Sequence, residues 1–236
     1  MFACLIIISA AADLILAKTG TVASGTDAGL VLVFATGFLI ACALASSLSF
    51  LAVLGRRLLL LALLSGAASA GAIVAGWGTA EMLAKLIFAI SAGLWIGLML
   101  TSIGQVLLIS GLIIIVDFYS VFLGPTKKII ESGSNWINYL TINLPVFGEP
   151  AISRLGISDM IFFSLFIAST LTYRLRRTIT VLAMTASFIG TMVAGVLLGR
   201  GVPALPLLSV SFILSNADLL YQRFLEEKNM GGRKEM

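Results

Sequence analysis

A series of apolar stretches, each about as long as a lipid bilayer is thick, is the feature that most constrains how this chain folds. A helix needs about 20 mostly apolar residues to cross the hydrocarbon core. Charged residues make up only 11% of the 236 residues, whereas soluble domains carry about a quarter, so the chain cannot cover a surface facing water. We therefore expect an all-α polytopic protein of the cell membrane, surrounded by the lipid bilayer, with about eight transmembrane helices. They are expected at residues 1–17, 28–54, 58–78, 82–101, 104–123, 155–173, 178–199 and 203–221.

The charged residues lie mainly in the short polar gaps between these stretches. Lys and Arg (15) exceed Asp and Glu (11), for a net charge of +4. Their placement favours positive-inside orientation signals over a nucleic-acid-binding surface. The basic residues are more numerous on the side of the C-terminus, which predicts a cytoplasmic C-terminus and an external loop at 124–154. The stretch 1–17 lacks the basic start of a signal peptide, so we expect a retained span.

The chain contains no histidine. Ser–His and Cys–His nucleophile pairs, HExxH zinc sites and haem ligation by histidine are therefore excluded. Cys4 and Cys42 lie in apolar stretches without a CxxC spacing, and we expect both to be small buried helix residues. Any chemistry must come from carboxylates, hydroxyls or amines, and no metal or organic cofactor is implied.

One polar gap, residues 124–154, is much longer than the others. Loops of this length usually carry function or lack order. Residues 140–144 alternate weakly between apolar and polar side chains, which is compatible with a short strand. Two interpretations stay open at this point: a surface loop, or an element that contacts a substrate.

Small residues gather in two of the expected helices. Residues 93–97 match the GxxxG pattern, and residues 65–78 are rich in Gly, Ala and Ser. Small side chains allow helices to approach closely in lipid. Chance matches are frequent in a chain with 23 glycines, so we expect these residues to pack helices within the molecule.

Ionisable side chains within the apolar stretches are candidates for function because they are costly at membrane depth. Asp117 follows a long apolar run and lies about 10 Å before the loop, at 1.5 Å per residue. Asp159 lies near the start of the next span. The remaining four lie within a turn or two of a predicted helix end, where we expect them to reach interfacial water: Asp13, Glu81, Lys85 and Asp218.

The long loop joins the two spans that carry Asp117 and Asp159, so these spans run antiparallel and both carboxylates lie near the loop. Two close carboxylates cannot both ionise cheaply, and such a pair shares a proton. An aspartic protease uses this arrangement, with one carboxylate activating water while the other supplies a proton. A proton-coupled transporter could use the same pair. From charge and burial alone both functions stay open, and the transporter is favoured.

Three motifs resemble those of presenilins and signal peptide peptidases. Residues 155–164 (Leu-Gly-Ile-Ser-Asp-Met-Ile-Phe-Phe-Ser) resemble the presenilin GxGD segment, and residues 116–125, from Val-Asp-Phe-Tyr to Gly-Pro, resemble its Tyr-Asp segment. Residues 203–208 (Pro-Ala-Leu-Pro-Leu-Leu) resemble the PAL motif that opens the last span. The three occur in the family's order and spacing. The resemblance covers residues 106–225 and is closest to the archaeal presenilin homologues.

The resemblance implies an intramembrane aspartyl protease whose partners are transmembrane-helix substrates. It makes Asp117 and Asp159 the catalytic pair and places five residues in the substrate site: Gly156, Ser158, Pro203, Ala204 and Leu205. The family has nine spans and a second glycine where this chain has Ser158. A degenerate homologue that only binds helices is therefore a further alternative. The chain divides accordingly into scaffold helices (1–105), catalytic helices with the long loop (106–225) and a charged tail (226–236).

Overall fold

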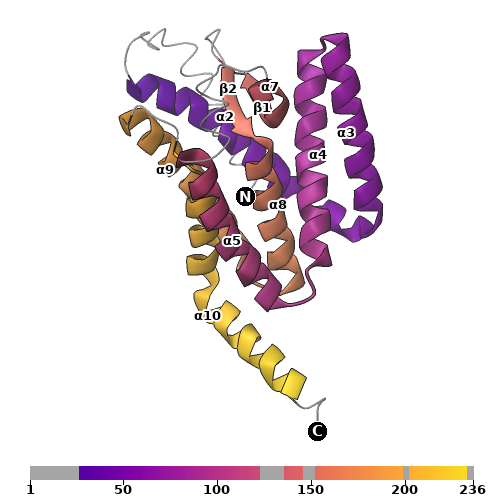
Figure 1. The fold of residues 1–236 in the computed structure, drawn as a ribbon, viewed down its shortest axis with the longest axis vertical. Coiled ribbons are helices and arrows are strands. Elements are labelled where there is room, and N and C mark those ends of the chain that lie inside the picture. The colour runs from indigo at the N-terminus through magenta and orange to yellow at the C-terminus, as the bar shows by residue number, and fades with distance from the viewer. Residues whose placement is uncertain (1–26, 123–135, 146–151, 199–201, 233–236) are drawn as a thin grey trace.

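The computed structural model describes residues 27–122, 136–145, 152–198 and 202–232. In this part of the chain it contains eight α-helices, one 3-10 helix and one β-hairpin (Figure 1). The expected first span, with Asp13 and Cys4, lies outside the described residues. The elements are α2 (Asp27–Leu48), η1 (Ser49–Leu54), α3 (Arg57–Ala75), α4 (Gly78–Met99), α5 (Ile103–Phe122), α7 (Trp136–Leu140), β1 (Thr141–Pro145), β2 (Ile152–Gly156), α8 (Ile157–Thr172), α9 (Arg177–Leu198) and α10 (Leu205–Gly232).

The helices follow the expected apolar stretches closely. Five described segments are long and apolar enough to cross a membrane, which identifies a multi-pass membrane protein: Gly37–Leu54, Arg57–Ala75, Gly78–Met99, Ile103–Ser120 and Arg177–Gly195. Helix α8 is also apolar but has only 16 residues. Helix α10 continues to Gly232 rather than ending near 221 as expected, because its charged end is rich in helix-forming Leu, Glu and Lys.

Helix α8 lies at the centre of the bundle. Its side chains from Phe163 to Thr170 are all buried. The Phe166 ring stacks on Phe212 of α10 with ring centroids 4.4 Å apart, and the Phe163 ring lies 5.8 Å from that of Phe188 in α9. A helix surrounded by neighbours can be apolar on all sides, which explains why α8 shows no polar face.

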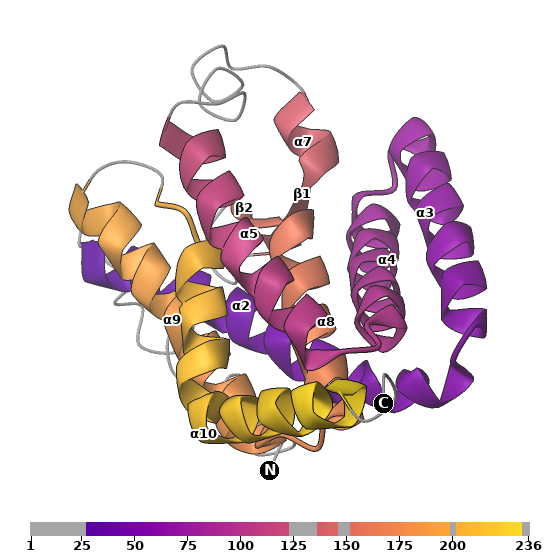
Figure 2. The same cartoon turned by 60° about the horizontal axis from the view of Figure 1, so that its bottom comes forward.

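Helix α4 packs against α8 at unusually short range through the GxxxG glycines. A Cβ atom on Gly97 would lie 2.6 Å from the Ala168 Cβ and 2.7 Å from the Leu165 carbonyl oxygen. Gly93 lies closer still to the α8 backbone, at the Ile161 carbonyl. The expectation that these glycines pack helices within the molecule is confirmed. Helices α3 and α4 form a hairpin at one side of the bundle (Figure 2).

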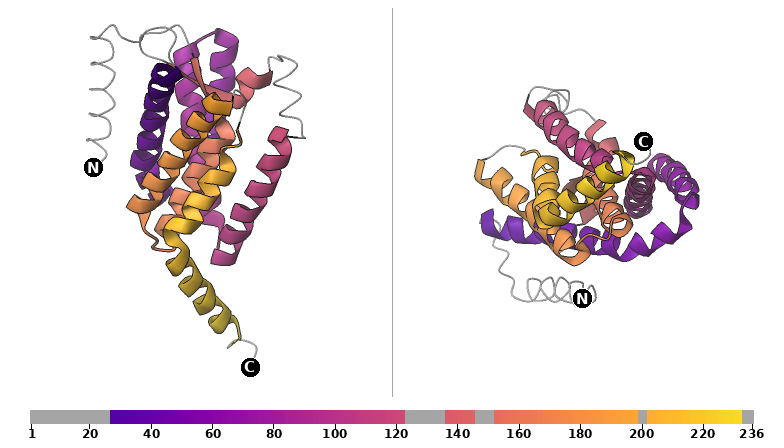
Figure 3. Two further views of the ribbon diagram at one scale, coloured as in Figure 1. Left: turned by 90° about the vertical axis from the view of Figure 1, so that its left-hand side faces the viewer. Right: turned by 90° about the horizontal axis from the view of Figure 1, so that it is seen from below.

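Helix α5 packs mainly against α10. The C-terminal part of α10 leaves the bundle (Figure 3), yet Glu227 accepts a hydrogen bond from the Ile103 N–H, which lies 3.0 Å from each carboxylate oxygen. This contact caps the N-terminus of α5. Nearby, the Tyr173 hydroxyl donates to the Leu100 carbonyl at 2.9 Å.

Cys42 is a buried free cysteine in α2, as expected.

Candidate functional site

A β-hairpin within the long polar gap leads directly into the helix that carries Asp159. Strands β1 and β2 are antiparallel, and Thr141 pairs with Gly156 at the end where α8 begins. The short strand compatible with residues 140–144 is confirmed, with bounds Thr141–Pro145. Because β2 ends at Gly156 and α8 starts at Ile157, Asp159 lies in the first turn of α8.

The Asp159 carboxylate folds back over Gly156. It accepts a hydrogen bond from the Gly156 backbone N–H, which is how a side chain at the third helical position caps its own helix. A Cβ atom at Gly156 would lie 2.7 Å from Asp159 Oδ2 and 3.2 Å from Cγ. Glycine is therefore required here for space, because its backbone angles, φ −61° and ψ 134°, suit any residue.

Asp117 is held by the segment with the Pro-Ala-Leu sequence. Its Oδ2 accepts a hydrogen bond from the Leu205 backbone N–H at 3.2 Å. Leu205 is the first residue of α10, and a helix leaves its first N–H groups without partners in the helix. Pro203 itself stands just before the helix and is buried. The Asp117 carboxylate of α5 thus gives the first backbone N–H of α10 a hydrogen-bond partner.

The two aspartates face the same cavity, which has a volume of about 1090 Å³. All seven residues expected at the site line this cavity: Asp117, Gly156, Ser158, Asp159, Pro203, Ala204 and Leu205. Ser158 is exposed within it. The structure therefore brings together three segments that lie as much as 88 residues apart in the sequence.

Most of the cavity wall is apolar and comes from α4, α5 and α8, including Phe88, Ile109 and Phe162. Leu112 and Val116 of α5 also line it, and they are 50% and 60% exposed. The cavity is therefore open along α5 to the surroundings of the bundle. An apolar cavity with two carboxylates at one end can hold an apolar chain segment beside a reactive polar centre.

The expected site residues included none from the α7–β1 junction. Tyr139, Leu140 and Thr141 lie there and line the cavity, and Thr141 pairs with Gly156 beside the start of α8. Of the two interpretations of the long gap, these residues favour the element that contacts a ligand. The weak alternation at 140–144 was the available signal, because a strand that pairs with the segment before α8 places its residues beside Asp159.

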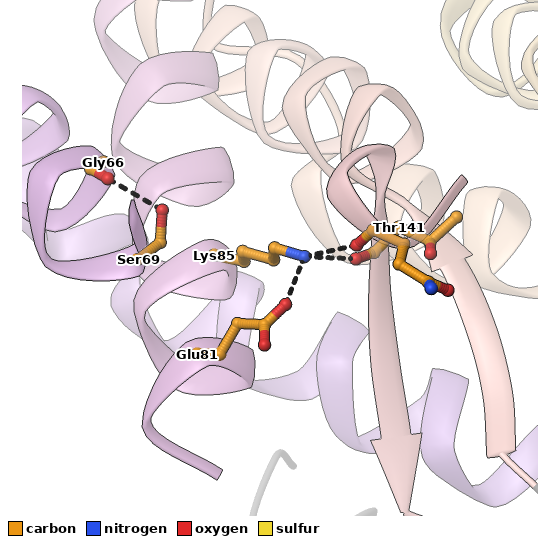
Figure 4. A network of polar contacts seen from close by, with 6 residues as sticks. Gly66, Ser69, Glu81, Lys85 and Thr141 are labelled. Carbon is orange, nitrogen blue, oxygen red and sulfur yellow. Dashed lines mark hydrogen bonds and ion pairs between the residues drawn. The ribbon is translucent and has the colours of Figure 1, made fainter. Parts of the chain in front are cut away.

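Of the charges expected near interfacial water, Asp218 behaves as predicted and Lys85 does not. The Asp218 side chain is 51% exposed and pairs with Arg176 at 2.6 Å. The Lys85 side chain is only 3% exposed, because its ammonium group is enclosed by Glu81 and by the backbone of the α7–β1 junction (Figure 4). The expectation for Lys85 was wrong.

Within the described residues, no group of three or more His, Cys, Asp or Glu side chains is arranged to hold a metal ion. The chemistry that the described residues offer at the cavity is that of a carboxylate pair. Comparison of the chain with models of protein families, with curated proteins and with solved structures found no match.

Proposed function

We propose that this chain is an intramembrane aspartyl endopeptidase of the presenilin and signal peptide peptidase type, with a presenilin-like fold of about eight transmembrane helices. It would hydrolyse peptide bonds within the transmembrane helices of other membrane proteins. One observation carries the proposal: Asp117 and Asp159, from different helices, face one apolar cavity, and each is held by a backbone N–H of a motif that resembles the family's.

The carboxylate pair suits peptide hydrolysis by water. One ionised carboxylate takes a proton from a water molecule, whose oxygen adds to the peptide carbonyl carbon, while the protonated carboxyl gives its proton to the carbonyl oxygen. The C–N bond then breaks as the amine leaving group receives a proton. The two roles are interchangeable on the geometry, since both carboxylates line the cavity. No cofactor takes part in this sequence.

The hydrogen bonds to backbone N–H groups have a further consequence. Each carboxylate is held by a backbone N–H group, and a backbone donor remains when a side chain is substituted. Such support keeps reacting groups in place. The substrate helix must unwind at the cleaved bond, because a helical carbonyl is already occupied by a hydrogen bond. The apolar wall accommodates the side chains of such a segment.

The test uses purified full-length protein in detergent with a single-span test substrate. Asp117→Asn, Asp159→Asn and the double variant should each lose cleavage while remaining folded, because neither carboxylate alone performs both proton transfers. Asp218→Asn is the matched control, since it removes an exposed carboxylate outside the cavity, and it should cleave normally. Substantial cleavage by either single variant at the site would refute the proposal.

A proton-coupled transporter with the same two aspartates is the second candidate, favoured by the apolar cavity's opening between helices. Transport predicts proton-coupled uptake into liposomes and no peptide products. A transition-state isostere of peptide hydrolysis should bind the protease only.

A further inference from the structure

Lys85 of α4 is a buried cation whose hydrogen-bonding capacity is fully used. Its Nζ donates to Glu81 Oε1 at 2.6 Å, to the Asn138 carbonyl at 2.6 Å and to the Thr141 carbonyl at 3.0 Å. An ammonium group has three N–H donors, so each has one acceptor. Two of the three acceptors are backbone carbonyls more than 50 residues away in the sequence.

The backbone that Lys85 holds is part of the proposed active site. Asn138 and Thr141 bracket the junction of α7 and β1, and Thr141 lines the catalytic cavity. Thr141 also pairs with Gly156 in the hairpin, and Gly156 donates its N–H to the Asp159 carboxylate. A short chain of contacts therefore leads from Lys85, through β1, to Asp159.

We propose that Lys85 is a positioning residue: its ammonium group fixes the α7–β1 backbone against α4 and thereby sets the hairpin wall beside Asp159. The proposal rests on the protease function proposed above for its catalytic consequence. Lys85 lines a separate smaller cavity rather than the catalytic one, so it acts through the hairpin and is not a catalytic residue.

The physical basis is that a buried ammonium must be fully paired. Charge-assisted hydrogen bonds are stronger than neutral ones, and a short, compact cation on a flexible stem can reach two carbonyls and a carboxylate at once. Neutral side chains of similar length supply at most weaker donors to the two carbonyls. Gly93 and Gly97, further along α4, pack against α8 itself. Helix α4 therefore contacts α8 through these glycines and the hairpin through Lys85.

The experiment compares four full-length proteins: wild type, Lys85→Met, Lys85→Arg and Arg176→Met. Lys85→Met removes all three donors at nearly constant volume and should lower kcat roughly 10- to 100-fold, the cost of small misplacements at a reacting centre, with KM little changed. It should also scatter the cleavage positions. Lys85→Arg keeps the charge and should restore part of kcat. Arg176→Met is the matched control: it removes an exposed cation that pairs with Asp218 outside the catalytic cavity, and should cleave at the normal positions.

Amide hydrogen exchange in residues 138–145 is the second measurement, and it does not depend on catalysis. Lys85→Met should speed exchange there, while Arg176→Met should leave it unchanged. Wild-type protein without peptidase activity would contradict the proposed function, and the exchange result would then decide the role of Lys85. An active wild type with unchanged kcat, cleavage positions and exchange in Lys85→Met would overturn the positioning role alone. If Lys85→Met does not fold, Lys85→Gln, which also removes the charge, replaces it, and wild-type kinetics and exchange in that variant would overturn the positioning role.

Discussion

The substitution Gly156→Ala tests the geometry of the site most directly, because only the Asp159 carboxylate stands in its way. The new Cβ would lie 2.7 Å from Asp159 Oδ2, whereas an ordinary contact needs at least about 3.4 Å. The carboxylate must therefore move by roughly 0.7 Å, and its hydrogen bond with the Gly156 N–H weakens. Misplacement by about 1 Å can cost roughly 100-fold in rate, so we expect kcat to fall about 10- to 100-fold.

Stability should respond differently from activity. The backbone angles of Gly156 suit alanine, and replacing glycine at such a position stabilises proteins by about 0.4–1 kcal/mol through the unfolded state. We therefore expect an unchanged or slightly raised melting temperature in detergent. Gly111→Ala in α5 is the matched control, because nothing lies within 4 Å of its new Cβ, and it should retain full cleavage. Wild-type kcat in folded Gly156→Ala would refute the placement of Asp159 over this glycine.

Two further predictions concern Ser158 in the cavity and the hydrogen bond between Glu227 and the N-terminus of α5. Because Ser158 is exposed in the cavity, Ser158→Gly should stay active and accept bulkier residues beside the cleaved bond, whereas Ser158→Leu should block cleavage without unfolding the bundle. Mass spectrometry of the products from a substrate panel would show this, and identical products from wild type and both variants would contradict it. Glu227→Ala should lower the free energy of unfolding by about 0.5–2 kcal/mol, the value of a helix cap. The control Glu226→Ala should not lower the free energy of unfolding, because Glu226 pairs with Arg223 on the exposed surface. Equal losses of stability in the two variants would contradict the capping role.

Much of the fold follows from hydropathy, because in lipid a helix must satisfy its own backbone and its length is set by the bilayer. The seven expected spans within the described residues all correspond to helices, and five of these are long and apolar enough to cross a membrane. The expected site residues came from short motifs rather than periodicity, and the structure gathers them around one cavity. The end of α10 was predicted too early, near residue 221. The charged composition of its last turns is typical of a frayed tail, yet these turns are helical as far as Gly232.

The burial of Lys85 shows what hydropathy leaves out. Its position one turn after Glu81, near the start of α4, is typical of a charge at the membrane surface. Its actual partners are backbone carbonyls of the α7–β1 junction, and a carbonyl belongs to every residue whatever its type. No sequence pattern marks an acceptor of this kind. For the same reason no sequence pattern indicated the hydrogen bond from the Leu205 N–H to Asp117. The motif resemblance placed Leu205 at the site, and the structure shows the hydrogen bond that holds it there.

The two aspartates belong to different helix pairs, and this determines what controls the distance between their carboxylates. Asp159 belongs with α4 and α8, which are held together through Gly93 and Gly97. Asp117 belongs with α5 and α10, which Glu227 also joins at the far end of α5. The cavity lies between the pairs, and α10 contacts α8 through the stacked rings of Phe166 and Phe212. The separation of the carboxylates therefore depends on how α10 sits against α8, directly through this ring pair and indirectly through α9, which packs on both helices.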